Sequence, residues 1–103
     1  MVDSSTNWVQ ELWDLLCQMY KAWGGDCKDL GPAPTKWVDT VNGAYQSYGA
    51  PKFADDGAKI AFLDLLTTLE SLLAEPDNSL GPADTDRLLT LITDLRNDLG
   101  AGA

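Results

Sequence analysis

Four segments of the sequence carry apolar residues at the three- and four-residue spacing of an amphipathic helix, and Gly or Pro residues separate them. The expected helices span about 8–23, 35–48, 55–75 and 82–99. The N-caps that these starts suggest are Asn7, Thr35 and Asp55 or Asp56. The pattern predicts an all-α fold in a single domain over 1–103, with flexible ends at 1–6 and 100–103.

A short motif occurs twice in the sequence, 50 positions apart. The matches at this offset are LGPAPT at 30–35 with LGPADT at 80–85, DLL at 14–16 with DLL at 64–66, and Thr40 with Thr90. The offset also lays the first expected helix on the third and the second on the fourth. We therefore predict a four-helix bundle of two tandem helical hairpins, over 8–49 and 55–99, related by pseudo-twofold symmetry. The alternative is convergence, because LGPA is a good helix entry and Leu-rich helices resemble one another.

The two expected hairpins differ in their aromatic content. All four Trp residues and seven of the nine aromatic residues lie at or before Tyr48, whereas the second hairpin is rich in Leu. Several apolar positions of the first hairpin align with polar positions of the second, so they are surplus to a shared core. Trp and Tyr are enriched at binding hot spots. The predicted partner-binding residues are Val9, Trp13, Tyr20, Trp37 and Tyr48. The alternative is that the first helix lies at the centre of the bundle and buries them.

The net charge of the chain is −9, from 16 acidic and 7 basic residues. Nucleic-acid binding depends on Lys and Arg that displace counterions from phosphates, so direct binding of DNA or RNA is not expected. The charge also opposes contact with anionic membranes. It favours solubility, and it would steer the chain to a basic protein. A special case is a mimic of nucleic acid, whose carboxylates stand in for phosphates.

The residue type that most often serves as a general base is missing. The sequence has no His, which removes Ser–His and Cys–His nucleophile pairs and the commonest metal ligand. We therefore predict no catalytic residues, no cofactor and no metal site. Cys17 and Cys27 are expected to be free thiols of a cytoplasmic protein, and a bridge between them stays open if the chain is exported.

These observations favour a non-catalytic interaction protein. The leading prediction is a small acidic adaptor or inhibitor, of the immunity or anti-defence type, that masks a basic partner protein. The aromatic surface would supply affinity, to that partner or to a second copy of the chain. One alternative is an accessory subunit of a larger complex. Another is a carrier of a small apolar ligand, held inside the bundle by Trp8, Trp23, Tyr45 and Phe62.

Overall fold

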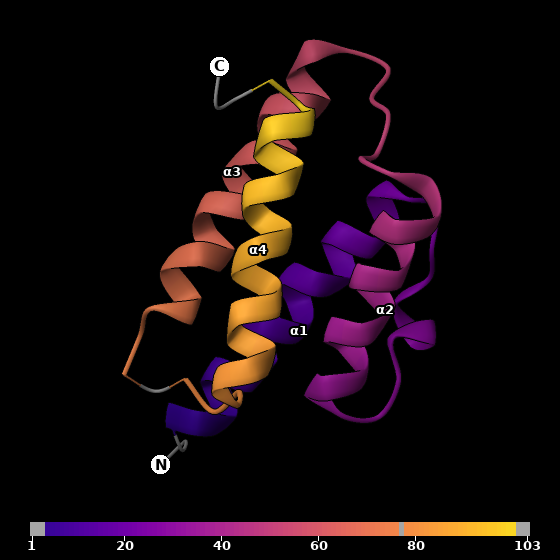
Figure 1. Cartoon of the computed structure of the whole chain (residues 1–103). Coiled ribbons are helices and arrows are strands. Elements are labelled where there is room, and N and C mark those ends of the chain that lie inside the picture. The colour runs from indigo at the N-terminus through magenta and orange to yellow at the C-terminus, as the bar shows by residue number, and fades with distance from the viewer. Residues whose placement is uncertain (1–3, 77, 101–103) are drawn as a thin grey trace.

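The computed structural model describes residues 4–76 and 78–100, and within them it contains helices and no strand. The elements are α1 (Ser4–Ala22), the short 3₁₀ helix η1 (Cys27–Leu30), α2 (Pro34–Tyr48), α3 (Asp56–Leu73) and α4 (Pro82–Asp98). Figure 1 shows the four α-helices arranged around one core. α1 packs against α2 and α3, and α4 packs against the same two helices, so α1 and α4 lie diagonally opposite. The predicted all-α four-helix bundle is confirmed.

Local capping explains where the helices begin and where the sequence prediction was wrong. α1 begins at Ser4, so Asn7 lies inside the helix and is not its N-cap. Residues 1–3 and 101–103 lie outside the described parts of the chain. α2 begins at Pro34 after Ala33, so Thr35 is not its N-cap. Asp55 does cap α3, because its side chain accepts a hydrogen bond of 2.8 Å from the Ala58 N–H.

The core consists of Leu residues from α1, α3 and α4 and Val residues from α2, together with the aromatic residues Trp8, Trp37 and Phe62. Leu12, Leu16, Leu66 and Leu88 are completely buried. The Trp8 ring lies among them, and its Nε1–H donates a bond of 2.8 Å to the Leu72 carbonyl oxygen. The interior is therefore closed by side-chain packing. No helix in the described parts of the chain is long and apolar enough to cross a membrane.

The helix directions differ from a pair of hairpins. The end of α1 lies beside the end of α2, since Trp23 Nε1 donates a bond of 2.7 Å to the Gly49 carbonyl oxygen. The two helix starts also meet, because Trp37 lines one hollow together with Val9 and Trp13. α1 and α2 are therefore parallel, whereas an αα-hairpin is antiparallel. α3 runs against both α1 and α4, so only 55–99 forms a hairpin as predicted.

The repeated motif does not produce two equivalent structures. In the first copy α2 begins at Pro34, the fifth residue of the motif, whereas in the second copy α4 begins at Pro82, the third. Gly31 has φ of 104°, a conformation that favours glycine, but the equivalent Gly81 has φ of −65°. The same short sequence therefore precedes two helices that begin in different ways. A pseudo-twofold relation between 8–49 and 58–99 is not supported, which favours the convergence alternative.

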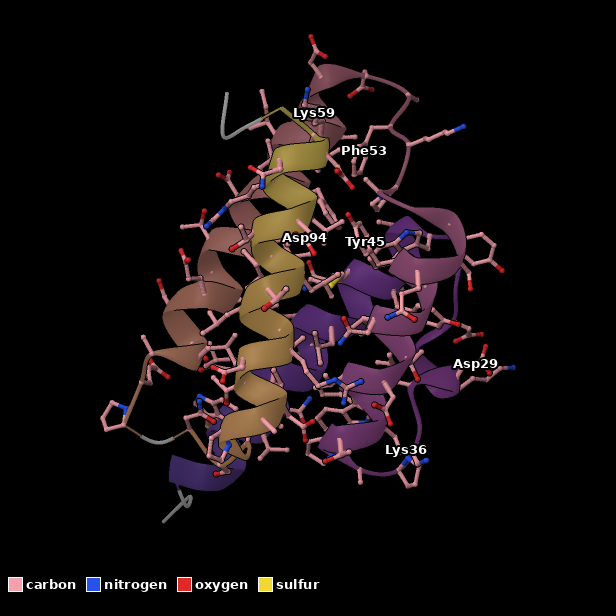
Figure 2. The ribbon with its side chains drawn as sticks, viewed as in Figure 1. Asp29, Lys36, Tyr45, Phe53, Lys59 and Asp94 are labelled. Atoms are coloured by element: carbon pink, nitrogen blue, oxygen red, sulfur yellow. A yellow bond between two sulfur atoms is a disulfide. The ribbon has the colours of Figure 1, made fainter. Side chains whose placement is uncertain are left out.

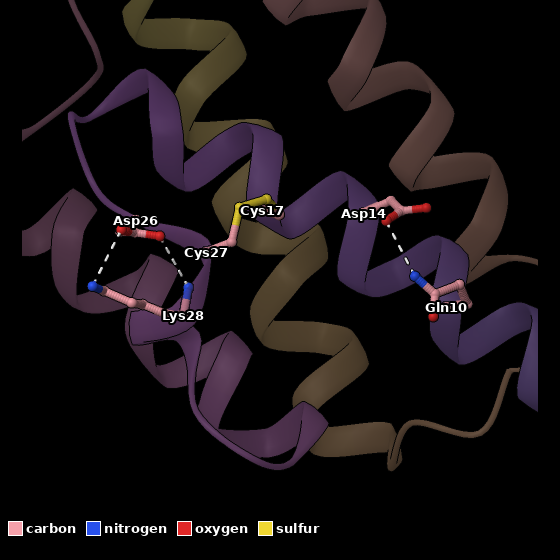
Figure 3. The surroundings of a disulfide bond; sticks show 6 residues. All are labelled: Gln10, Asp14, Cys17, Asp26, Cys27 and Lys28. Carbon is pink, nitrogen blue, oxygen red and sulfur yellow. Dashed lines mark hydrogen bonds and ion pairs between the residues drawn. A yellow bond between two sulfur atoms is a disulfide. The ribbon is translucent and has the colours of Figure 1, made fainter.

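The segment 23–33 returns along α1 so that α2 can start beside the start of α1. A disulfide between Cys17 and Cys27 fixes this linker to the middle of α1, with a Cα–Cα distance of 4.9 Å (Figure 3). Farther along, Thr40 Oγ1 donates to the Leu30 carbonyl oxygen, and Asp26 caps η1 by accepting from the Lys28 N–H. The prediction of two free thiols is wrong, and the bridged alternative is the one observed.

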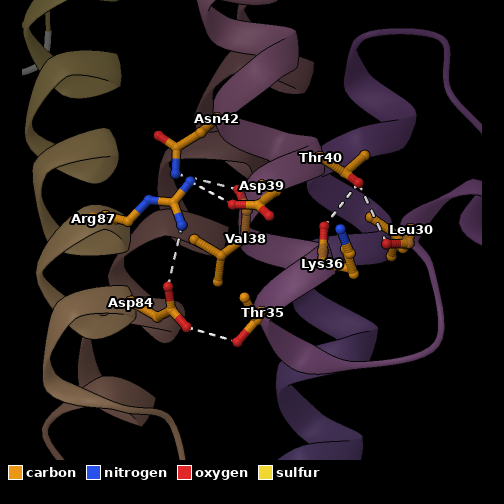
Figure 4. A network of polar contacts seen from close by, with 9 residues as sticks. All are labelled: Leu30, Thr35, Lys36, Val38, Asp39, Thr40, Asn42, Asp84 and Arg87. Carbon is orange, nitrogen blue, oxygen red and sulfur yellow. Dashed lines mark hydrogen bonds and ion pairs between the residues drawn. The ribbon is translucent and has the colours of Figure 1, made fainter.

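Polar side chains connect α2 to α4 along their whole length. Figure 4 shows Thr35 donating to Asp84 at 2.8 Å, and Arg87 forming ion pairs with both Asp39 (2.6 Å) and Asp84 (3.1 Å). These carboxylates raise the pKa of Arg87. Because Arg87 and Asp39 are more than two-fifths exposed and Asp84 is 17% exposed, solvent weakens each ion pair, and each contributes little on its own. Their role is to fix the parallel register of the two helices.

The far end of the same seam carries the most perturbed titratable group. The Tyr45 hydroxyl donates to Asp98 Oδ2 at 2.5 Å, and Figure 2 shows Tyr45 on the side of α2 that faces α4 and Asp94. The hydrogen bond to Asp98, partial burial and the negative charges of Asp98 and Asp94 raise the pKa of Tyr45 to about 12.

The disulfide generates the first prediction. The double substitution Cys17→Ala/Cys27→Ala should lower the free energy of unfolding by roughly 2–3 kcal/mol, because the unfolded chain regains the freedom of the closed loop. Ala is chosen because Cys17 is buried and a hydroxyl there would lack a partner. Urea denaturation measures the change, and reduced wild-type protein should match the double variant. Equal urea midpoints for the oxidised and reduced wild type would contradict the expectation.

The Tyr45 hydroxyl generates a second prediction. A pKa raised in the folded state favours folding below pH 10 and loses this contribution as the pH rises toward 12. Tyr45→Phe should therefore flatten the loss of stability between pH 10 and 12 and remove the last tyrosinate transition, seen by ultraviolet absorbance. Asp98→Asn should move that transition to lower pH. The assignment fails if Tyr45→Phe leaves the highest transition unchanged.

Candidate functional site

A hollow of about 320 Å³ lies between the first turns of α1 and α2. It is lined by Val9, Gln10 and Trp13 from α1 and by Trp37 from α2, and it is called the Trp13 hollow below. Residues 9, 10 and 13 share one face of α1, and the parallel packing of the helices brings Trp37 opposite them. The volume falls at the lower end of the range of ligand pockets and accommodates one large side chain.

Trp37 forms a fixed wall of this hollow. Only 7% of its surface is exposed, and its Nε1–H donates a bond of 2.8 Å to the Gly31 carbonyl oxygen in the linker. The Trp37 ring is thus held by the segment that the disulfide fixes to α1. Most of its surface belongs to the core, and one side is left to the hollow.

Trp13 differs from the other three tryptophans. The indole N–H groups of Trp8, Trp23 and Trp37 each donate to a backbone carbonyl oxygen at 2.7–2.8 Å. Trp13 is half-buried, and its N–H has no hydrogen-bond partner among residues 4–76 and 78–100. A buried Trp N–H usually finds a partner in the protein, whereas the N–H of Trp13 is accessible at the surface. Trp13 therefore offers an apolar ring and a free donor at the same place.

The structure does not bring all five predicted residues together. Val9, Trp13 and Trp37 line the Trp13 hollow, but Tyr20 lies half-buried against the linker, where a Cβ at Gly25 would clash with its ring. Tyr48 is 74% exposed and lies at the other end of α2. The parallel helices place positions 9, 13 and 37 at one end of the bundle and position 48 at the other, so only three of the five predicted residues meet at this hollow.

Three elements pack against the apolar face of α1. α2, α3 and η1 each pack on part of it, whereas the backbone of α4 does not come close to α1, so α1 is not a central helix wrapped by the other three. Its polar ridge is exposed, at Gln10, Glu11, Asp14, Gln18 and Lys21. Gln10 Nε2 donates to Asp14 Oδ1 at 3.2 Å (Figure 3). The carboxylate of Asp14 is thereby held next to Gln10, which lines the Trp13 hollow.

Several Cys, Asp and Glu side chains outside the Trp13 hollow have partners within the fold. Cys17 and Cys27 are bonded to each other, and the described residues contain no group of three His, Cys, Asp or Glu residues that could hold a metal ion. Asp55 caps α3, and Asp84 pairs with Arg87. Glu70 receives two hydrogen bonds from Arg96, which lower the pKa of Glu70.

No protein-family model, no curated protein and no solved structure matches this chain significantly.

Sequence reasoning identified Val9, Trp13 and Trp37 by residue type but missed Gln10 and the acceptor of Trp37. Gln10 shares a helical face with Val9 and Trp13, so their spacing was a usable signal. Gly31 could not be foreseen as the acceptor, because its carbonyl oxygen reaches Trp37 only when the linker turns back along α1.

The tryptophan environments generate a third prediction. Acrylamide, an uncharged quencher, should reach Trp13 but not Trp8, which is 2% exposed. Trp13→Phe should therefore lower the Stern–Volmer constant of the folded protein, whereas the matched variant Trp8→Phe should raise it by removing a shielded emitter. Equal constants for the wild type and Trp13→Phe would show that Trp13 is shielded, and the proposed surface would fail with it.

Proposed function

We propose that the chain is a non-catalytic protein-binding protein, an adaptor or inhibitor that masks a basic partner, and that the Trp13 hollow is its anchor point. The observation that carries this proposal is the combination at Trp13 of a half-buried ring, an unpaired N–H group and an adjoining hollow of about 320 Å³. An apolar side chain of the partner would enter the hollow. A backbone carbonyl oxygen beside that side chain would accept from Trp13 Nε1.

The charges of α1 support a basic partner. Glu11 and Asp14 are exposed on α1, Asp14 accepts a hydrogen bond from Gln10 of the hollow, and the whole chain carries a net charge of −9. Long-range attraction would speed association with a basic surface, while the desolvated contact at Trp13 would determine how long the complex lasts. Added salt should therefore slow binding without abolishing it, which distinguishes this mode from a nucleic-acid mimic whose affinity rests on carboxylates alone.

The contacts of the interior do not favour the apolar-ligand carrier. Trp23 and Phe62 meet edge to face, with ring centroids 6.4 Å apart, and Trp8 and Trp23 both donate to backbone carbonyl oxygens. Tyr45 is held by Asp98. All four side chains therefore already have partners within the fold, and they contribute to its packing.

The disulfide supports a compartment other than the one that the sequence favoured. Disulfides persist in oxidising surroundings and are rare in a reducing cytoplasm. With Cys17 bonded to Cys27, we propose that the protein acts where this bridge is stable, on the outer side of a membrane or in a secretory compartment. A partner would be met in the same place.

A matched pair of baits tests the proposed function. Tagged wild-type protein, Trp13→Ala and Tyr48→Ala are each used to capture proteins from an extract of the native host, and the retained proteins are quantified. Trp13→Ala should lose a basic protein at least tenfold, since truncating a hot-spot Trp costs about 2 kcal/mol or more. Tyr48→Ala removes an exposed aromatic ring of another surface and should retain it.

Two further conditions make the capture decisive. The complex should survive a wash at about 0.5 M salt, where charge–charge attraction between exposed groups is largely screened. Circular dichroism should show that all three baits are equally folded. Retention of the same proteins by wild type and Trp13→Ala would overturn the proposed anchor, and a partner that is lost only through salt would favour the mimic.

A further inference from the structure

A second hollowed surface, partly polar and partly apolar, lies at the end of the bundle away from the Trp13 hollow. One hollow of about 470 Å³ is lined by Ala22, Trp23, Gly24, Tyr48, Ala50, Pro51 and Lys52. Another of about 210 Å³ is lined by Gln18, Ala22, Phe53, Ala58, Ala61, Phe62 and Leu65. Because Ala22 lines both, the two adjoin, and together they are called the Ala22 trough.

The floor of the Ala22 trough is made of ordered aromatic residues. Phe53 packs on Phe62 with ring centroids 5.2 Å apart, and Trp23 meets the same Phe62 ring from the other side of the junction. Trp23 is fixed in turn by its bond to the Gly49 carbonyl oxygen. Figure 2 shows Phe53 in the segment that joins α2 to α3, at the end of the bundle where Lys59 lies. This surface is thus formed before anything binds to it.

The rim of the Ala22 trough carries both signs of charge. Lys52 lines it, and Lys21 directly precedes Ala22; neither forms an ion pair with a residue in 4–76 or 78–100. Asp55 and Asp56 begin α3 just before Ala58, which lines the smaller of the two hollows. Most other exposed charge on the molecule is negative, as the net charge of −9 requires.

We propose that a second copy of this chain covers the Ala22 trough in an isologous dimer. An isologous interface places one patch against itself, so the patch must be self-complementary. The Ala22 trough meets this condition, because a twofold axis across it would set Lys52 of one copy against Asp55 or Asp56 of the other. Elsewhere two chains of charge −9 would present like charges to each other. This dimer leaves the Trp13 hollow open and does not depend on the proposed function.

The proposed dimer has a salt dependence opposite to that of the proposed partner. Salt screens the overall repulsion between two chains of charge −9, whereas the burial of apolar surface is not screened. Raising the ionic strength should therefore strengthen dimerisation. The same change should slow association with a basic protein.

Sedimentation equilibrium of the full oxidised chain tests the proposal. The mass should rise with concentration from 11.2 kDa to twice that value, and more readily at about 0.5 M salt than at about 0.1 M. Ala61→Glu places a charge on the wall of the trough at an exposed helical position and should raise the dimer dissociation constant by about tenfold or more. The matched control is Ile60→Glu, because Ile60 is 57% exposed and lines neither hollow.

A charge exchange then distinguishes a second copy from other occupants. Lys52→Glu should weaken the dimer, and Lys52→Glu/Asp56→Lys should restore it, since only a partner that carries the same substitutions regains opposite charges. A mass of 11.2 kDa at every concentration and salt would overturn the proposal. A dimer weakened by Ile60→Glu or Trp13→Ala but not by Ala61→Glu would overturn it as well.

Discussion

The parallel pairing of α1 with α2 is the constraint on which the rest of the structure depends. Two consecutive helices can run in the same direction only if the chain between them travels back along the first. The segment 23–33 does so, and the Cys17–Cys27 bridge holds it midway while the Leu30 and Gly31 carbonyl oxygens accept bonds from α2. This one arrangement brings Trp37 beside Trp13 and places Tyr48 at the opposite end.

The helices themselves could be predicted from the sequence, but their directions could not. Apolar spacing and the Gly and Pro residues between segments located all four helices to within a few residues. Direction depends on the path of the linker, and an extended segment of the length of 23–33 is long enough to span α1. The sequence was therefore compatible with either direction. The shared LGPA letters favoured a hairpin, although Gly31 and Gly81 take different conformations.

Part of the candidate site could be predicted from the sequence without the repeated motif. Tryptophans on an amphipathic helix indicate large contact area, and Trp13 and Trp37 do meet at one hollow. What sequence could not show is which indole N–H groups find acceptors inside the fold. The N–H groups of Trp8 and Trp23 donate to the carbonyl oxygens of residues 72 and 49, which are distant in sequence. The N–H of Trp37 donates to the carbonyl oxygen of residue 31, which comes within reach because the linker turns back along α1. Trp13 is distinguished by tertiary structure alone.

The position of the bridge in the chain has a consequence for how the protein is made. Both cysteines lie within the first 27 residues, ahead of α2, α3 and α4. A nascent chain can therefore close this ring while most of the bundle is still being synthesised. Once the bridge is closed, α2, α3 and α4 pack onto a chain in which the linker already runs back along α1. The chain order therefore allows the path of the linker to be fixed before the Leu-rich half is available to pack.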